Sequence, residues 1–322
     1  MERLVVVLVA LVAASISSPS FAQGAYPAKS IRMLLGFSAG GTSDALARDV
    51  AQALTTRLGH PVVVENRPGA GGNLANEAVA RGATDGYTIL FASSSIAIAS
   101  AVYEKLGYDP LKDLAPISLV ASAPNLLVVP ANLPVRTVRE FVDLARQKPG
   151  TVTYASAGNG SVAHLSGELL GLMANVKFQH VPYKGNAPAT VDLIAGVVQA
   201  NFNQVNALAP LVKAGKLKAL AVASKVRTPL LPDVPTMAEQ GFPAFDLEPW
   251  FGMFAPAGTS QAIVDKLSAE VDAIVKSPDM SKRWELQGAR AIGGSPDEFA
   301  RRFREETARM GKLARDSGAK VD

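Results

Sequence analysis

The sequence lacks cysteine altogether and contains only three histidines, His60, His164 and His180, among its 322 residues. Without cysteine there is neither a disulfide nor a thiolate metal ligand, so the stability of the protein has to come from buried cores. No two histidines have the spacing of a metal site. The sequence therefore predicts no bound metal ion.

A large excess of charge of one sign is also missing. Lysine and arginine number 32 and aspartate and glutamate 28, which gives a formal net charge of +4. These charges are scattered, whereas nucleic-acid binding is typically marked by a clustered basic face with aromatic residues. We expect no nucleic-acid partner, and the mild positive charge slightly favours anionic small molecules.

Long hydrophobic runs are scarce. Leu4–Ala14 is an unbroken apolar run of eleven residues, which is too short for a bilayer span of about 20 residues. It follows Arg3 and precedes Ser20-Phe21-Ala22, which offers small residues where a signal peptidase reads them. Residues 1–22 are therefore predicted to be a signal peptide that sends the mature chain to the periplasm. A membrane anchor is the alternative, and the missing cysteine excludes a lipoprotein.

Strand-like and helix-like segments alternate along the rest of the chain, which is long enough for two domains. The first series has expected strands at residues 31–37, 62–65 and 88–92, with helices at 44–58 and 73–81 between them. This order predicts an α/β fold with a parallel sheet covered by helices. A second series of strands and helices runs to about residue 224, and the last third of the chain is helical, with a capping box at Ser295.

Extended segments near residues 116–124 and 244–250 separate the two series. We therefore predict two lobes, with residues 23–123 plus 247–322 in lobe 1 and residues 124–246 in lobe 2. Two lobes joined by two crossover segments form a cleft that closes by bending at this hinge.

Two turns rich in glycine and serine stand at equivalent places in the two lobes. In lobe 1 the first strand is followed by Gly36–Asp44 and by a helix that we expect Thr42 or Ser43 to cap. In lobe 2 the turn Ser156–Ser161 leads from a strand into another helix. Such turns gather free backbone N–H groups at the positive end of a helix and bind anions without a charged side chain. We predict that the two turns face each other across the cleft and hold one anion.

No arrangement typical of an enzyme is complete. The turn Gly158-Asn159-Gly160-Ser161 has the wrong spacing for a nucleophile elbow. The glycine-rich turns also fail to complete a dinucleotide-binding motif, and there is no phosphate-binding lysine motif. We therefore predict no cofactor and no enzymatic activity. A periplasmic hydrolase that uses Ser161 or His164 is the alternative.

Polar residues at other strand ends extend the candidate site. Ser93 and Ser94 follow the third strand, Tyr183 and Asn203 end two strands of lobe 2, and His164 lies one turn into the helix after Ser161. The predicted ligand-binding residues are Phe37, Ser38, Ala39, Gly40, Gly41, Thr42, Asp44, Ser93, Ser94, Ser156, Ala157, Gly158, Gly160, Ser161, His164, Tyr183 and Asn203.

The order of these motifs resembles that of the Bug-type (TctC-like) periplasmic solute receptors, which serve tripartite tricarboxylate transporters. The similarity runs from Tyr26-Pro27 to the C-terminal helix. The segments that carry it are Gly36–Asp44, Val64–Gly72, Asp85–Tyr87, Val181–Gly185, Leu220–Ser224, Leu231–Thr236 and Phe254–Gly258.

This resemblance implies a two-lobe, type II periplasmic-binding-protein fold in which the two turns grip a ligand carboxylate, partly through bridging waters. It implies small organic acids as ligands, membrane transporter subunits as partners, and a receptor that we expect to be monomeric. Many relatives carry aspartate near the position of Asn203, so this chain is expected to favour a carboxylate without an ammonium group. A sensor that presents its ligand-bound form to a signalling partner is the alternative.

Overall fold

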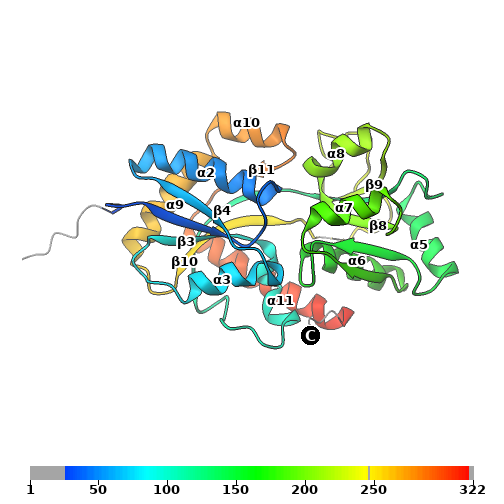
Figure 1. Cartoon of the computed structure of the whole chain (residues 1–322), viewed down its shortest axis with the longest axis horizontal. Helices are drawn as coiled ribbons and strands as arrows, with labels where there is room; N and C mark the ends of the chain where they lie inside the picture. Colours follow the sequence, from blue (N-terminus) through cyan, green and yellow to red (C-terminus); the bar gives the residue numbers. More distant parts are fainter. Residues whose placement is uncertain (1–25, 246, 319–322) are drawn as a thin grey trace, which may run out of the picture.

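The computed structural model describes residues 26–245 and 247–318 of the chain. Figure 1 shows two α/β lobes side by side, and each lobe is built on its own sheet. The predicted signal peptide, residues 1–22, lies outside the described residues. Within the described part of the chain, no helix has the length and apolar character needed to cross a bilayer.

Lobe 1 contains a mixed sheet of six strands in the order β11-β4-β10-β3-β1-β2. As the first series of elements predicts, β1 pairs in parallel with both β2 and β3. β10, which comes much later in the chain, runs antiparallel between β3 and β4. The strands are β1 (Ile31–Leu35), β2 (Val62–Asn66), β3 (Thr88–Ser93), β4 (Leu114–Ser122), β10 (Trp250–Pro256) and β11 (Arg290–Ala291).

Successive residues of a strand point to opposite faces of the sheet. Because those of a buried strand are apolar on both faces, helices pack on both faces of this sheet. Met33 and Leu35 pack in the core with α2, α9 and α10, whereas Leu34 packs in a separate core with α3 and α11. The helices of lobe 1 are α2 (Thr42–Leu58), α3 (Asn73–Ala80), α4 (Ala99–Val102), α9 (Gln261–Val275), α10 (Pro278–Leu286) and α11 (Pro296–Ser317), with short 3-10 helices η1 (Ala70–Gly72) and η2 (Ser94–Ala97).

Lobe 2 contains a sheet of five strands in the order β7-β6-β8-β5-β9. β6 pairs in parallel with β7 and β8, whereas β5 runs antiparallel to β8 and β9. α5 and α6 cover one face, and α7 and α8 cover the other. The elements are β5 (Asn125–Pro130), α5 (Val138–Gln147), β6 (Thr153–Ser156), α6 (Val162–Ala174), β7 (Gln179–Pro182), α7 (Asn186–Ile194), β8 (Ala200–Gln204), α8 (Val205–Lys213) and β9 (Leu217–Ala223).

The chain crosses between the lobes twice, from β4 to β5 and from β9 to β10. The two crossover segments touch, because the Ala123 N–H donates to the Pro249 carbonyl (3.1 Å). The next carbonyl, that of Pro124, accepts from Val205 N–H at the start of α8 (3.0 Å). The hinge thus consists of two short adjacent segments, while the exact lobe boundaries at residues 123 and 247 stay a prediction.

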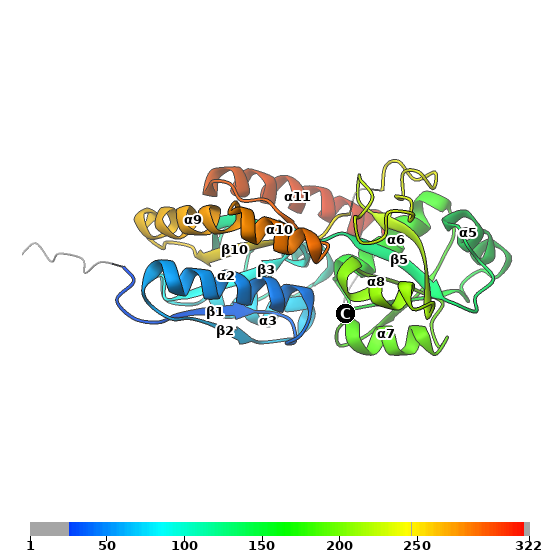
Figure 2. The same cartoon turned by 90° about the horizontal axis from the view of Figure 1, so that it is seen from above.

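The end of α11 also connects the two lobes without a covalent link. Met310 and Ala314 of this helix, together with Ile98 and Val102 at the two ends of α4, are buried in a core that otherwise consists of lobe 2 residues and Leu247 of the second crossover segment. Figure 2 shows α11 running from lobe 1 towards lobe 2. Any rigid-body motion of the lobes would therefore shift this apolar contact as well as bend the hinge.

Two elements of lobe 1 differ from the sequence-based expectation. An extended crossing was expected from residue 116 onwards, but β4 is a long strand because β10 and β11 pair with its two edges. The spacing of apolar residues in the sequence also does not predict α10 as a separate helix. This helix is held by Trp284, which is fully buried and donates from Nε1 to Asp49 Oδ2 (2.9 Å).

The predicted capping box at Ser295 is confirmed, and it provides a test of the fold. The Ser295 hydroxyl accepts from the Glu298 N–H, and the Glu298 carboxylate accepts from the Ser295 N–H. Because Ser295 is exposed, Ser295→Ala removes the cap without removing core contacts and should lower the free energy of unfolding by about 1 kcal/mol. Urea unfolding measures this change. Ser295→Thr, which keeps a hydroxyl, should have a smaller effect, and equal losses in the two variants would contradict the capping role.

Candidate functional site

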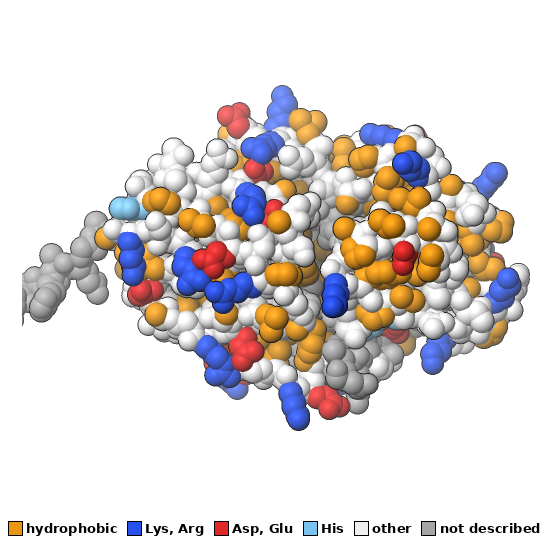
Figure 3. All heavy atoms as spheres, in the orientation of Figure 1, with side chains coloured by type: hydrophobic (Ala, Val, Ile, Leu, Met, Phe, Trp, Pro, Cys, Tyr) orange, Lys and Arg blue, Asp and Glu red, His pale blue; other side chains and the backbone are white. Residues whose placement is uncertain are grey.

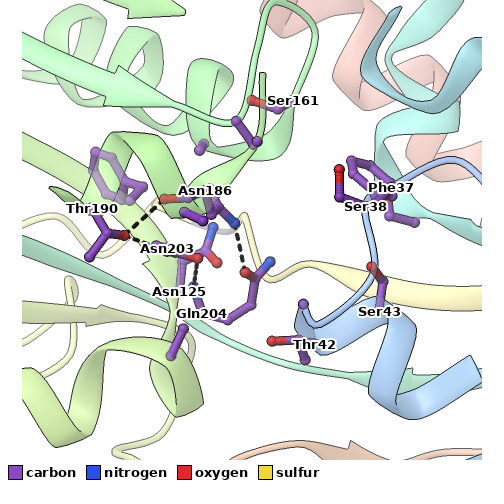
Figure 4. Close-up of a pocket in the computed structure, with 18 of the residues that line it drawn as sticks. Phe37, Ser38, Thr42, Ser43, Asn125, Ser161, Asn186, Thr190, Asn203 and Gln204 are labelled. Atoms are coloured by element: carbon purple, nitrogen blue, oxygen red, sulfur yellow. Dashed lines mark hydrogen bonds between the residues drawn. The ribbon is translucent and has the colours of Figure 1, made fainter. Parts of the chain in front are cut away.

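A cavity of about 560 Å³ lies between the two lobes. Its volume falls within the range of small-molecule sites, roughly 300–1,000 Å³. The turn after β1 lines it from lobe 1, and the starts of α6, α7 and α8 line it from lobe 2 (Figure 4). Ten of the predicted ligand-binding residues line this cavity, namely Phe37, Ser38, Ala39, Gly40, Gly41, Thr42, Ser93, Ala157, Ser161 and Asn203.

The start of α2 differs from the prediction. The N-cap is Gly41, and no side chain caps the helix, so the expected capping by Thr42 or Ser43 is wrong. The helix begins two residues earlier than the sequence suggests, which places both hydroxyl residues inside its first turn. The Thr42 hydroxyl is therefore free to point across the cleft, where it donates to Asn206 Oδ1 of lobe 2 (2.8 Å).

Asp44 holds the lobe 1 turn from behind. Its Oδ2 accepts from the Gly40 N–H (3.0 Å) and from Arg48 Nε (3.0 Å), and its Oδ1 accepts from Asn66 Nδ2 (2.9 Å). Burial alone raises the pKa of the Asp44 carboxyl, but these hydrogen bonds outweigh burial and hold the pKa below its ordinary value. Asp44 is thus a carboxylate that positions the turn, and its oxygens are already occupied.

The lobe 2 turn is held in a similar way by serines. The Ser161 hydroxyl caps α6 by accepting from the His164 N–H (3.2 Å). The Ser156 hydroxyl accepts from the Gly158 N–H (3.1 Å) and lies 2.7 Å from His180 Nε2. This turn therefore has its shape fixed by side chains that belong to the strand and the helix on either side of it.

A stacked pair of histidines lies behind the lobe 2 turn. The rings of His164 and His180 are 4.0 Å apart and nearly parallel, at 14°. His164 Nδ1 accepts from the Gly160 N–H (3.2 Å), and because a backbone N–H can only donate, Nδ1 carries no proton. Burial lowers the pKa of His164 to about 4, and burial together with His164 lowers the pKa of His180 to about 3. Both rings are therefore neutral near pH 7.

Free backbone donors face the cavity from both turns. Within residues 26–245 and 247–318, no hydrogen bond uses the N–H groups of Gly41 and Thr42 at the start of α2, or those of Val162 and Ala163 at the start of α6. The first N–H groups of a helix have no partner inside the helix. They carry a partial positive charge at the end of the helix dipole. All four residues line the cavity, while anion binding by the two turns stays a prediction.

Several residues that line the cavity from lobe 2 were not predicted. Asn186 and Thr190 come from the first turns of α7, and Asn125 begins β5. β8 passes into α8 without an intervening turn, so no glycine or serine cluster marks this helix start. The position of α7 and α8 after strand ends was the available signal, because ligands in open α/β sheets bind at the carboxyl ends of strands.

Within the described residues, two side-chain hydrogen bonds join the lobes. One is the bond from Thr42 to Asn206 described above. In the other, the Tyr103 hydroxyl donates to the carbonyl of Asn159 in the lobe 2 turn (3.2 Å). The structure is therefore in a form in which the lobes touch around the site.

The remaining predicted residues do not line the cavity, and for them a direct ligand contact stays a prediction. Ser94 accepts from the Trp250 N–H (3.3 Å). The Tyr183 hydroxyl donates to Asp192 Oδ2 (2.6 Å), and burial and this carboxylate raise the pKa of Tyr183 to about 12. The residues of this group are Asp44, Ser94, Ser156, Gly158, Gly160, His164 and Tyr183.

The described residues that line the cavity carry little charge. Among the described residues that line it, Lys184 is the only charged one, and it is exposed. On the face of the molecule drawn in Figure 3, the lysine and arginine side chains are scattered over the surface. Within the described residues there is no cluster of three histidine, aspartate or glutamate side chains that could hold a metal ion. His164 uses Nδ1 to accept from the turn, so this atom is not available as a base for Ser161.

Two α/β lobes that enclose a cavity of this kind define a solute-binding protein. The model of the tripartite tricarboxylate transporter family receptor matches residues 46–319 of the chain. BugT of Bordetella pertussis is 37% identical over 324 positions, which cover 100% of this chain and 99% of BugT. The chain therefore belongs to the tripartite tricarboxylate transporter receptor family, and the resemblance seen in its motifs is confirmed.

Solved structures agree with this assignment. The chain is similar to Rpa4515 of R. palustris with adipate, with a TM-score of 0.87 and 37% identity over 92% of this chain and 100% of Rpa4515. It is similar to the periplasmic binding protein BugD with a TM-score of 0.85 and 33% identity, over 92% of this chain and 100% of BugD. The predicted two-lobe periplasmic-binding-protein fold is thus confirmed.

The histidine pair predicts a loss of stability in acid. Because both pKa values are depressed in the folded protein, the unfolded chain binds more protons below about pH 6.5, and stability falls as the pH decreases towards the folded pKa values. Between about pH 7.5 and pH 5.5, two such histidines should lower the free energy of unfolding by about 2 kcal/mol. Urea unfolding at the two pH values measures this.

A double variant provides the control. His164→Asn keeps an acceptor for Gly160, and His180→Gln keeps a polar atom for Ser156, but neither side chain titrates. This variant should lose clearly less stability over the same pH range. An identical loss in the wild type and the double variant would assign the effect to other groups.

Proposed function

We propose that the chain is a periplasmic receptor that binds a small organic acid through its carboxylate and delivers it to the membrane subunits of a tripartite tricarboxylate transporter. The observation that carries this proposal is the set of free N–H groups at the starts of α2 and α6, which face one cavity with little charge of its own. Backbone donors at helix N-termini bind anions such as carboxylates without a counter-charge. Membership of the transporter receptor family and the adipate in the related Rpa4515 support the same ligand class.

The role as a transport receptor includes further proposals. Residues 1–22 are proposed to direct export, because their apolar run precedes small residues typical of a cleavage site. The mature chain is proposed to act as a monomer without catalytic activity. His164 Nδ1 already accepts from the Gly160 N–H and is therefore not available as a base for Ser161, which supports the absence of a hydrolytic mechanism.

A screen of organic acids tests the proposed function. The mature chain, starting at residue 23, is heated with mono-, di- and tricarboxylates, and its melting temperature is compared with that of the chain alone. An acid present at 100 times its dissociation constant should stabilise the fold by about 2.7 kcal/mol, and thus raise the melting temperature by about 5 °C or more. The methyl ester of the same acid is the control and should give no shift. If no acid stabilises the chain, the proposal fails.

Gly40 tests whether the lobe 1 turn is the anion grip. It has φ of +86°, and a Cβ atom added there would meet nothing within 4 Å, so a side chain would stand in open space beside the cavity. Gly40→Leu should abolish binding of the acid found in the screen, because its side chain keeps the carboxylate away from the backbone donors. Calorimetric titration measures the affinity.

The matched control for Gly40 is Gly59. It also has positive φ (+72°) and no atom within 4 Å of an added Cβ, but it lies at the far end of α2. Gly40→Leu and Gly59→Leu should both lose about 1–2 kcal/mol of stability from backbone strain. Only the Gly40 variant should lose the ligand, and retained affinity there would contradict the grip.

A further inference from the structure

Asn125 is a buried amide in the cavity wall whose side chain has no hydrogen-bond partner among the described residues. It is the first residue of β5, directly after the first crossover segment, and only 2% of its surface is exposed. It lines the cavity, and its Oδ1 is buried without a hydrogen bond. Within residues 26–245 and 247–318, no group accepts a hydrogen bond from its Nδ2 either. The whole amide, which can both donate and accept, is therefore left for a group inside the cavity.

The neighbouring polar side chains do not serve Asn125 because they bind one another. Asn203 Oδ1 accepts from the Gln204 N–H (2.7 Å), and Asn203 Nδ2 contacts Thr190 Oγ1 (3.4 Å). Asn186 Nδ2 donates to Gln204 Oε1 (3.0 Å). Figure 4 shows this network beside Asn125 and opposite the lobe 1 turn.

Within the described residues, one buried side-chain atom of that network also lacks a hydrogen-bond partner. Asn186 Oδ1 is buried and unbonded, and Asn186 lines the same cavity. The lobe 2 wall thus offers the cavity one free amide and one further free amide oxygen. Groups of this kind are satisfied by a neutral ligand group that donates and accepts, which describes an alcohol or a primary amide.

A charged group fits this wall less well. The cavity lining contains no carboxylate that could pair with an ammonium group, since Asp44 lies behind the turn with both oxygens occupied and Asp192 accepts from Tyr183. Lys184, the only cation of the lining, is exposed to solvent. A buried charge without a partner is strongly disfavoured.

We propose that Asn125, assisted by Asn186, is the specificity-determining residue of the cavity and selects organic acids that carry a neutral hydroxyl or carboxamide group away from the carboxylate. The inference rests on the proposed function, because it assumes that the N–H groups of the two turns hold the carboxylate. The ligand then spans from the starts of α2 and α6 to the lobe 2 wall. Its alcohol or amide satisfies Asn125, which otherwise stays buried and unpartnered.

Matched pairs of ligands test the proposal by calorimetric titration of the mature chain. The probes are ω-hydroxyalkanoates of three to eight carbons, each compared with the alkanoate and with the ω-aminoalkanoate of the same length. For the chain length that fits, the hydroxy acid should bind about tenfold more tightly than the alkanoate, because only the hydroxyl satisfies the buried amide. The ω-amino acid should bind no better than the alkanoate.

Variants of Asn125 assign this preference to the residue. Leucine has nearly the same size as asparagine. Asn125→Leu should bring the ratio of the affinities for the hydroxy acid and the alkanoate close to one, while the alkanoate still binds. Asn125→Asp, a second variant of the same shape, should instead favour the ω-amino acid over the hydroxy acid. If the Asn125→Leu variant does not fold, the affinity ratios of the Asn125→Asp variant and of the wild type test the role of Asn125.

The matched control is Asn201→Leu. Asn201 is also a fully buried asparagine without partners in the same sheet, but it does not line the cavity. Replacing Asn201 should leave the ratio of the affinities for the hydroxy acid and the alkanoate unchanged.

The outcomes separate this proposal from the proposed function. If acids bind but no chain length prefers the hydroxy acid, or if Asn125→Leu keeps the preference, the role of Asn125 is overturned and the receptor function stands. If neither these probes nor any acid of the screen binds, both fail.

Discussion

The structure depends on one electrostatic arrangement, in which backbone N–H groups at helix starts face a cavity that contains almost no charge. These donors need no side chain of their own, so the binding capacity is built into the path of the main chain. That path has to be held closely, because a carboxylate oxygen and an N–H group interact only over about 3 Å. The remainder of the site serves to keep the two turns in shape and opposite each other.

Different side chains hold the two turns from behind. In lobe 1 the Asp44 carboxylate binds the Gly40 N–H and is itself kept ionised by Arg48 and Asn66. In lobe 2 the neutral ring of His164 binds the Gly160 N–H. Each acceptor removes one N–H from the set available to a ligand and in exchange fixes the backbone around the free ones. Asp44 and His164 thus hold the turns, whereas a direct contact of either residue with a ligand stays a prediction.

The lobes are placed by contacts that lie outside the turns. The bond between Ala123 and Pro249 keeps the two crossover segments together, and the end of α11 is buried in the lobe 2 core. The bonds from Thr42 to Asn206 and from Tyr103 to Asn159 join the lobes around the cavity. Both of these bonds between the lobes are only partly buried.

Local sequence patterns determined the strands, turns and helices of this protein, and the tertiary structure decided which of these elements lie next to one another. The strand–turn–helix at Gly36–Asp44, its counterpart at Ser156–Ser161 and the capping box at Ser295 were predictable, because periodicity and capping act over a few residues. Strand order was not, since the insertion of β10 between β3 and β4 joins segments far apart in the chain. The direction of a side chain was equally hidden, so His164 lies behind the turn while Asn125, which follows a crossover without any motif, faces the cavity. Such residues become neighbours only through the packing of two sheets, for which one sequence carries no local signal.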